Sequence, residues 1–136
     1  MTTAANTAAP RALDTAAILV AAGSSTRMRL PGQSTAPRKP WLELGGRPLL
    51  AHVVDAFEAA PSIAELIVVA HADDVERVLE LESRRPLVVV PGGATRAASV
   101  RAGLAAIRGD ATLVAIHDAA RPLIAPGLVE RVLERA

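Results

Sequence analysis

The chain has 136 residues, 51% of them hydrophobic and 21% charged, with a net charge of +1 at pH 7. This composition supports one folded domain, argues against general disorder and shows no basic excess that would indicate a nucleic-acid partner or an anionic membrane surface. The absence of cysteine excludes disulfides and thiolate chemistry, and no apolar run approaches the roughly 20 residues that a membrane helix needs.

Residues 1–15 are rich in Ala and Thr but lack the apolar core of a signal peptide, so we expect a flexible N-terminal extension of a cytoplasmic protein. A short transit peptide is the alternative. Four short apolar runs with little polar alternation then predict parallel strands covered on both faces. The predicted strands are Ala16–Ala22, Glu65–Ala70, Pro86–Val90 and Thr112–Ile116.

Helices are predicted between and after these strands, because apolar residues recur there every three or four positions. The predicted helices are Pro48–Ala59, Asp73–Leu81, Thr95–Arg108 and Pro126–Ala136. In the third of them the spacing places Val100, Leu104 and Ile107 on one face. The alternation predicts an α/β fold with a doubly wound, mostly parallel, Rossmann-like sheet, which binds ligands beyond the carboxyl ends of its strands.

The first candidate site follows the first predicted strand. Alanine and glycine at Ala21–Gly23 allow a ligand to approach the main chain closely, and the amides and hydroxyls of Ser24–Thr26 could cradle phosphates. Arg27 adds a forked donor for phosphate oxygens. An ordinary strand-to-loop turn with a surface arginine is the alternative, and neither the dinucleotide fingerprint nor the P-loop motif is present.

The second candidate is Lys39, the only lysine among the fifteen basic residues. It ends the aperiodic segment Arg29–Pro40, which is rich in Pro, Gly and Ser and is predicted to be a mobile loop. Pro40 favours an extended conformation of Lys39 that presents the ammonium, with Trp41 as an anchor. A solvated basic pair, Arg38 and Lys39, beside a buried tryptophan is the alternative.

The third candidate is a glycine turn after the third predicted strand. Gly92 and Gly93 open a helix whose free amides and positive dipole end would face the ligand. Arg96 and Ser99 lie three residues apart and share a helical face. A plain glycine turn with a helix cap is the alternative.

The fourth candidate is Asp118, in the segment His117–Pro122 that follows the last predicted strand. A carboxylate in this place could hold Mg²⁺ and orient a ribose, and the small Ala119 and Ala120 leave room for a ligand. An ion pair between Asp118 and Arg121 is the alternative. His117 is better explained as a structural histidine than as a catalyst.

These four segments, in this order, resemble the 2-C-methyl-D-erythritol 4-phosphate cytidylyltransferase family of the non-mevalonate isoprenoid pathway, from about Ala16 to the C-terminus. Gly-Gly-x-x-Arg-x-x-Ser-Val and His-Asp-Ala-Ala-Arg-Pro carry the resemblance, and ribitol-5-phosphate cytidylyltransferases share them. The resemblance implies an enzyme that transfers CMP from CTP to 2-C-methyl-D-erythritol 4-phosphate and releases pyrophosphate. Ribitol 5-phosphate as acceptor, or a catalytically inactive nucleotide-binding fragment, are the alternatives.

The resemblance also implies roles for individual residues. Arg27 and Lys39 would stabilise charge on the reacting phosphates, and Asp118 would bind Mg²⁺. The residues that would surround the nucleotide are Ala21, Ala22, Gly23, Ser24, Gly93, Ser99 and Ala119. The partners would be CTP and a small sugar-alcohol phosphate.

Family members continue well past this length. We therefore expect residues 16–136 to be a nucleotidyltransferase domain that is incomplete at its C-terminus. The missing part would carry the acceptor contacts, later strands and the arm that makes the full-length protein a homodimer. The chain departs from the family at Ser25, where many members have glycine, at Ala94, where an acid is common, and in its longer Arg29–Arg38 stretch.

Overall fold

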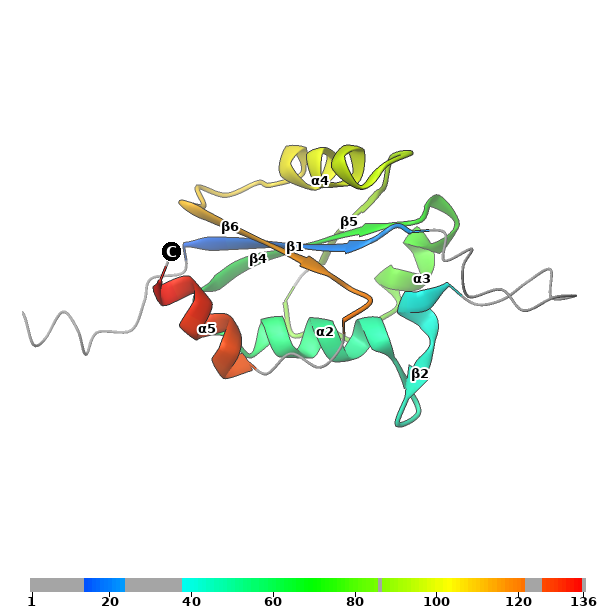
Figure 1. Cartoon of the computed structure of the whole chain (residues 1–136), viewed down its shortest axis with the longest axis horizontal. Coiled ribbons are helices and arrows are strands. Elements are labelled where there is room, and N and C mark those ends of the chain that lie inside the picture. The colour runs from blue at the N-terminus through cyan, green and yellow to red at the C-terminus, as the bar shows by residue number, and fades with distance from the viewer. Residues whose placement is uncertain (1–13, 24–37, 86, 122–125, 136) are drawn as a thin grey trace, which may run out of the picture.

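The computed structural model describes residues 14–23, 38–85, 87–121 and 126–135 (Figure 1). Two candidate site residues, Ser24 and Arg27, lie outside the described residues, as do the first thirteen residues of the predicted N-terminal extension and most of the predicted loop. Within the described part, no helix is both long and apolar enough to cross a bilayer.

A parallel sheet with the strand order β5-β4-β1-β6 forms the centre of the fold. Its strands are β1 (Thr15–Ala21), β4 (Ile63–Ala70), β5 (Leu87–Pro91) and β6 (Leu113–Asp118). Ile18 of β1 lies opposite Ile67 of β4 on one side and Ile116 of β6 on the other. Each predicted strand lies within two residues of an observed one, so the predicted parallel α/β sheet is confirmed.

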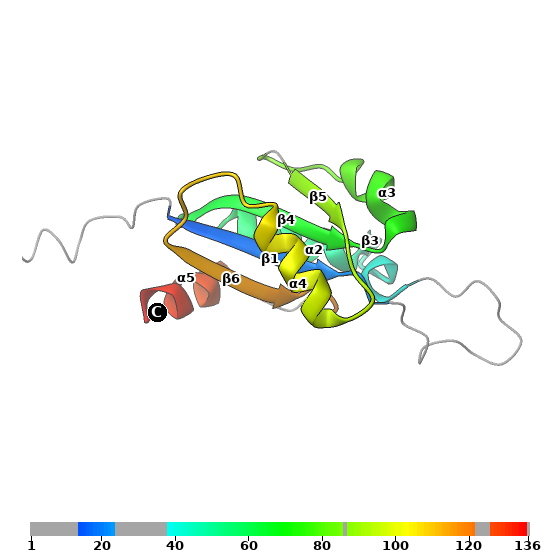
Figure 2. The same ribbon diagram turned by 90° about the horizontal axis from the view of Figure 1, so that it is seen from above.

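Helices cover both faces of the sheet, as the doubly wound prediction requires. One face carries α2 and α5, and the opposite face carries α4 (Figures 1 and 2). The short α3 follows the 3-10 turn η3 after β4. The bounds of these elements are α2 (Leu49–Glu58), η3 (Ala72–Asp74), α3 (Val75–Leu79), α4 (Arg96–Ala105) and α5 (Pro126–Glu134).

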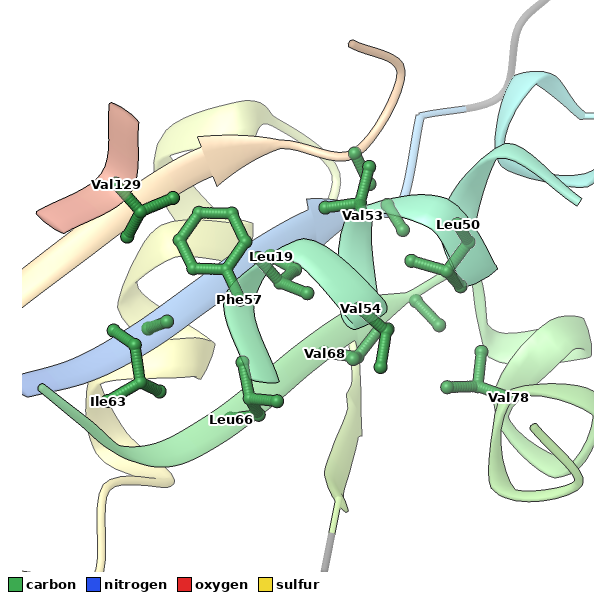
Figure 3. Close-up of a cluster of buried hydrophobic side chains, with 14 of the residues drawn as sticks. Leu19, Leu50, Val53, Val54, Phe57, Ile63, Leu66, Val68, Val78 and Val129 are labelled. Atoms are coloured by element: carbon green, nitrogen blue, oxygen red, sulfur yellow. The ribbon is translucent and has the colours of Figure 1, made fainter. Parts of the chain in front are cut away.

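The main hydrophobic core lies between the sheet and the α2–α5 face, where Phe57 of α2 lies close to Val129 of α5 (Figure 3). Leu19 of β1 and Leu66 of β4 belong to the same cluster and are fully buried. A smaller cluster under α4 contains Ile18 together with other side chains of β1 and β4. The two central strands, β1 and β4, are therefore buried between helical layers.

One prediction about burial is wrong. The sequence predicts strands covered on both faces, but on β6 the side chains of Val114 and Ile116 are 40% and 44% exposed. The reason is topological: β6 is an edge strand, and α4 packs on β1, β4 and β5 instead.

The predicted inner face of α4 is also partly wrong, because Leu104 is 44% exposed whereas Ser99 and Gly103 are buried. A Cβ atom added to Gly103 would lie 2.6 Å from Cγ2 of Ile18 and 3.0 Å from Cγ2 of Val69. The helix thus approaches the sheet more closely than a side chain at position 103 would allow.

The connection from Arg38 to α2 holds elements that the sequence did not predict. They are the 3-10 turn η2 (Lys39–Trp41) and the hairpin strands β2 (Glu43–Leu44) and β3 (Arg47–Pro48). The predicted extended conformation of Lys39 is wrong, because Lys39 begins η2 and Arg38 is the extended residue. Pro40 fits the turn, since a first-turn residue needs no backbone N–H partner.

Candidate functional site

A cavity of about 520 Å³ lies at the carboxyl ends of β1, β4 and β6. It is lined by Val20, Ala22 and Gly23 at the end of β1, by His71 after β4, by residues 93–96 and Ser99 at the start of α4, and by Asp118 at the end of β6. The volume lies within the range of small-molecule sites. The cavity also occupies the sheet edge at which doubly wound folds bind their ligands.

The glycine turn fits closely against the end of β1. The Gly92 N–H donates to the Ala70 carbonyl oxygen at 2.8 Å, which holds the turn to β4. A Cβ atom at Gly92 would collide with the Ala22 side chain and lie 2.7 Å from the Ser99 hydroxyl oxygen. That hydroxyl accepts from the Gly93 N–H at 3.1 Å. Ser99 is buried, so its hydroxyl holds the turn from the interior of the protein.

The first turn of α4 forms one wall of the cavity. Thr95 is the N-cap residue, and its side-chain oxygen accepts from the Ala98 N–H at 3.0 Å. Arg96 begins the helix and is exposed on the cavity. Because a helix N-terminus carries partial positive charge and free N–H groups, this wall favours an electron-rich group, either a phosphate or a hydrogen-bond acceptor of a base.

Asp118 places a carboxylate on the same cavity, at the end of β6. Its Oδ1 accepts from the Ala120 N–H at 3.0 Å. Both Asp118 and Arg121 are described, and no ion pair joins their side chains; the Arg121 N–H donates to the Asp118 carbonyl oxygen instead. The alternative of a loop ion pair is therefore wrong. His117 donates from Nε2 to the Arg121 carbonyl oxygen at 2.9 Å, as a structural histidine does.

The carboxylate of Asp118 fits Mg²⁺ better than it fits an ion that needs a full protein cage. Among the described residues, no group of three or more His, Cys, Asp or Glu side chains could hold a metal. Mg²⁺ keeps several waters and is commonly held by one or two carboxylates plus substrate phosphates. A single carboxylate on the wall of a cavity of about 520 Å³ agrees with that pattern.

The structure brings five of the predicted nucleotide and metal residues together on one cavity: Ala22, Gly23, Gly93, Ser99 and Asp118. Ala21 is the buried last residue of β1. Ala119 is fully buried and donates its N–H to the Val20 carbonyl oxygen at 2.9 Å. These two residues support the cavity from behind.

Lys39 is exposed in η2 and is not among the cavity-lining residues. Its neighbour Arg38 connects the turn to the cavity, because Arg38 Nη2 lies 3.1 Å from Nδ1 of His71. Sequence reasoning missed His71. Its place directly after β4, on the same sheet edge as Gly23 and Asp118, is a signal that could have identified it.

Comparison with known proteins relates this chain to one family. The family model described as 2-C-methyl-D-erythritol 4-phosphate cytidylyltransferase (IspD) matches residues 15–136. A protein of that name from Cereibacter sphaeroides is 45% identical over 126 residues, which are 89% of this chain and 53% of the relative. A bifunctional enzyme IspD/IspF from Dinoroseobacter shibae is 44% identical over 117 residues, which are 86% of this chain and 28% of that protein.

A solved structure shows a similar fold. The 4-diphosphocytidyl-2C-methyl-D-erythritol synthase from Anaerococcus prevotii superposes with a TM-score of 0.74 at 27% identity, covering 90% of this chain and 50% of that one. The chain therefore spans about half the length, or less, of the relatives that it matches.

Proposed function

The chain belongs to the 2-C-methyl-D-erythritol 4-phosphate cytidylyltransferase family, and from this premise we propose that it transfers CMP from CTP to 2-C-methyl-D-erythritol 4-phosphate. One observation carries the proposal: a glycine turn, a helix N-terminus and a carboxylate meet on one cavity at the carboxyl edge of the sheet. These are the groups that a nucleoside triphosphate and its cation require.

In the proposed reaction, a phosphate oxygen of the acceptor attacks the α-phosphorus of CTP. The new P–O bond joins the two phosphates, the bond from the α-phosphorus to the β-phosphate oxygen breaks, and pyrophosphate leaves. The attacking phosphate is already anionic, so the step needs no general base and no covalent enzyme intermediate. Catalysis then consists of positioning the reactants and neutralising charge.

We assign the residues to two tasks. Ala22, Gly93 and Ser99, backed by Ala21, would surround the cytosine, and Gly23 and Ser24 would wrap the triphosphate. Ala119 would lie near the ribose.

The second task is charge neutralisation. Asp118 would hold Mg²⁺, which when bound neutralises charge on the triphosphate. Arg27 and Lys39 would stabilise the charge that develops on the reacting phosphates. The domain boundary at residue 16 and a homodimeric full-length protein belong to the same proposal, and their support is the family resemblance. The cytoplasmic location is proposed from the composition of residues 1–15.

Nucleotide selectivity tests the proposal. A ligand present at 100 times its Kd stabilises the native state by about 2.7 kcal/mol. We therefore expect CTP with Mg²⁺ to raise the melting temperature more than ATP, GTP or UTP does, and equal shifts for all four would contradict a cytidylyl role.

A product assay then identifies the acceptor. We expect a CDP-alcohol from 2-C-methyl-D-erythritol 4-phosphate. Faster product formation from ribitol 5-phosphate would assign the other acceptor, and CTP binding without any turnover would identify an inactive nucleotide-binding fragment.

A further inference from the structure

Arg38 forms a compact polar cluster with the segment that follows β4. Its Nη2 atom lies 3.1 Å from Nδ1 of His71 and 3.5 Å from Oδ2 of Asp73, and its Nε atom lies 3.1 Å from Oδ2 of Asp74. Asp74 is buried, and the Arg38 side chain is only 24% exposed. The guanidinium therefore contacts three residues of one short segment at once.

The contact between Arg38 and Asp74 joins opposite charges at two buried atoms. Arg38 Nε and Asp74 Oδ2 are both buried, and neither makes a hydrogen bond within the described residues, so the contact is an ion pair. Each of these charges compensates the other at two buried atoms, although the rest of the Arg38 side chain is partly exposed. Removing one partner would leave an uncompensated charge and would push the segments apart.

The contact between Arg38 and His71 also determines which ring nitrogen of His71 carries the proton. The Asp73 backbone N–H donates to Nδ1 of His71 at 3.1 Å, and Arg38 approaches the same nitrogen. Both neighbours of Nδ1 are obligate donors, so Nδ1 accepts and the proton lies on Nε2. His71 lines the cavity. Arg38 therefore links the turn that begins at Lys39 to the cavity wall.

The other end of the turn is held by the same region of the fold. Trp41, the last residue of η2, is 5% exposed, and the Arg77 guanidinium carbon lies 4.0 Å from the centre of its ring. Arg77 belongs to α3, directly after η3. The turn thus has an ion pair before Lys39 and a cation–π contact after it, both with residues 71–79.

We propose that Arg38 is a positioning residue, which holds the Lys39–Trp41 turn beside the cavity through its contacts with Asp74 and His71. That Lys39 then acts on substrate phosphates rests on the proposed function. The position of the turn does not rest on the proposed function, and it can be measured separately.

Trp41 supplies this readout, since the chain has one tryptophan and no tyrosine. We expect Arg38→Ala to shift the Trp41 emission maximum to longer wavelength and to increase its quenching by acrylamide. Arg38→Lys should give an intermediate result, because a point charge cannot contact His71 and Asp74 together as the planar fork does. A third variant, Arg38→Ala with Asp74→Asn, removes both charges. It should preserve the fold yet still expose Trp41.

Arg47→Ala is the matched control. Arg47 Nη1 lies 2.6 Å from Oδ2 of Asp55, but this ion pair is about half exposed and lies on β3 and α2. The control should leave Trp41 emission and quenching as in the wild type. Wild-type quenching in all Arg38 variants would overturn the proposal, because the turn would then be held by the packing of Trp41 alone.

Turnover provides a second test through a double-mutant cycle with Lys39. A displacement of about 1 Å can cost on the order of 10²-fold in rate, so Arg38→Ala should lower kcat by up to that factor and change the KM for CTP much less. In a Lys39→Ala background the same change should have no further effect on kcat. If the effects of Arg38→Ala and Lys39→Ala on kcat are additive, a role of Arg38 that acts through Lys39 is overturned. If the wild type neither binds nor turns over CTP, the proposed function fails, while Trp41 quenching still decides the positioning.

Discussion

Gly103→Ala tests how closely α4 packs against the sheet. Alanine is intrinsically better than glycine inside a helix by about 1 kcal/mol. Against this gain, the new methyl group would lie 2.6 Å from Cγ2 of Ile18 and 3.0 Å from Cγ2 of Val69. Both neighbours are fully buried, β-branched residues of central strands, so they cannot move aside easily. Overpacking of this kind costs about 1–3 kcal/mol. Subtracting the gain from this cost leaves an expected net destabilisation of up to about 2 kcal/mol.

Gly127→Ala in α5 is the matched control. A Cβ atom there would meet nothing closer than Nη1 of Arg131 at 3.9 Å, so this change should stabilise the protein by roughly 0.5–1 kcal/mol. Thermal unfolding followed by Trp41 fluorescence measures both variants, with about 4 °C expected for each kcal/mol. A Gly103→Ala variant that melts at or above the wild-type temperature would refute the close packing.

Two further predictions concern the proposed reaction. Asp118→Asn should weaken Mg²⁺-dependent CTP binding while the melting temperature stays near that of the wild type, which calorimetric titration with and without Mg²⁺ can measure; unchanged metal dependence would rule out Asp118 as the metal ligand. Lys39→Ala should lower kcat by on the order of 10²-fold with little change in the KM for CTP, and Lys39→Arg should restore only part of the rate. Steady-state kinetics can measure these effects. A near wild-type rate for Lys39→Ala would contradict the catalytic role assigned to Lys39.

The strands could be predicted from the sequence because short runs of Val, Ile and Leu without polar alternation rarely occur in a domain except as buried strands. Once the strands alternate with helices, the parallel topology brings Gly23, Gly93 and Asp118 to one edge of the sheet. Residues far apart in the sequence could thus be assigned to one cavity. The prediction needed only the direction of each strand and the residue that follows it.

The elements that were missed depend on contacts that leave little trace in the sequence. Strands β2 and β3 have two residues each, which is too short for any periodicity. The exposed side chains on β6 depend on which strand lies at the edge of the sheet, and strand order does not follow from the apolar pattern. Arg38 contacts a histidine 33 positions later in the chain, and composition indicates no such pairing.

The error on α4 has a different cause, and it bears on the site. Hydrophobic periodicity assigns Leu104 to the inner face because it is large and apolar, yet the helix turns Ser99 and Gly103 inward. A small inner face permits close approach of the helix, and Ser99 can then reach the Gly93 N–H and shape the glycine turn. A helix displaced by larger inner residues would withdraw its first turn, and its partial positive charge, from the cavity. Ser99 and Gly103, which the hydrophobic pattern does not assign to the inner face, are therefore the residues that bring the helix N-terminus to the carboxyl edge of the sheet.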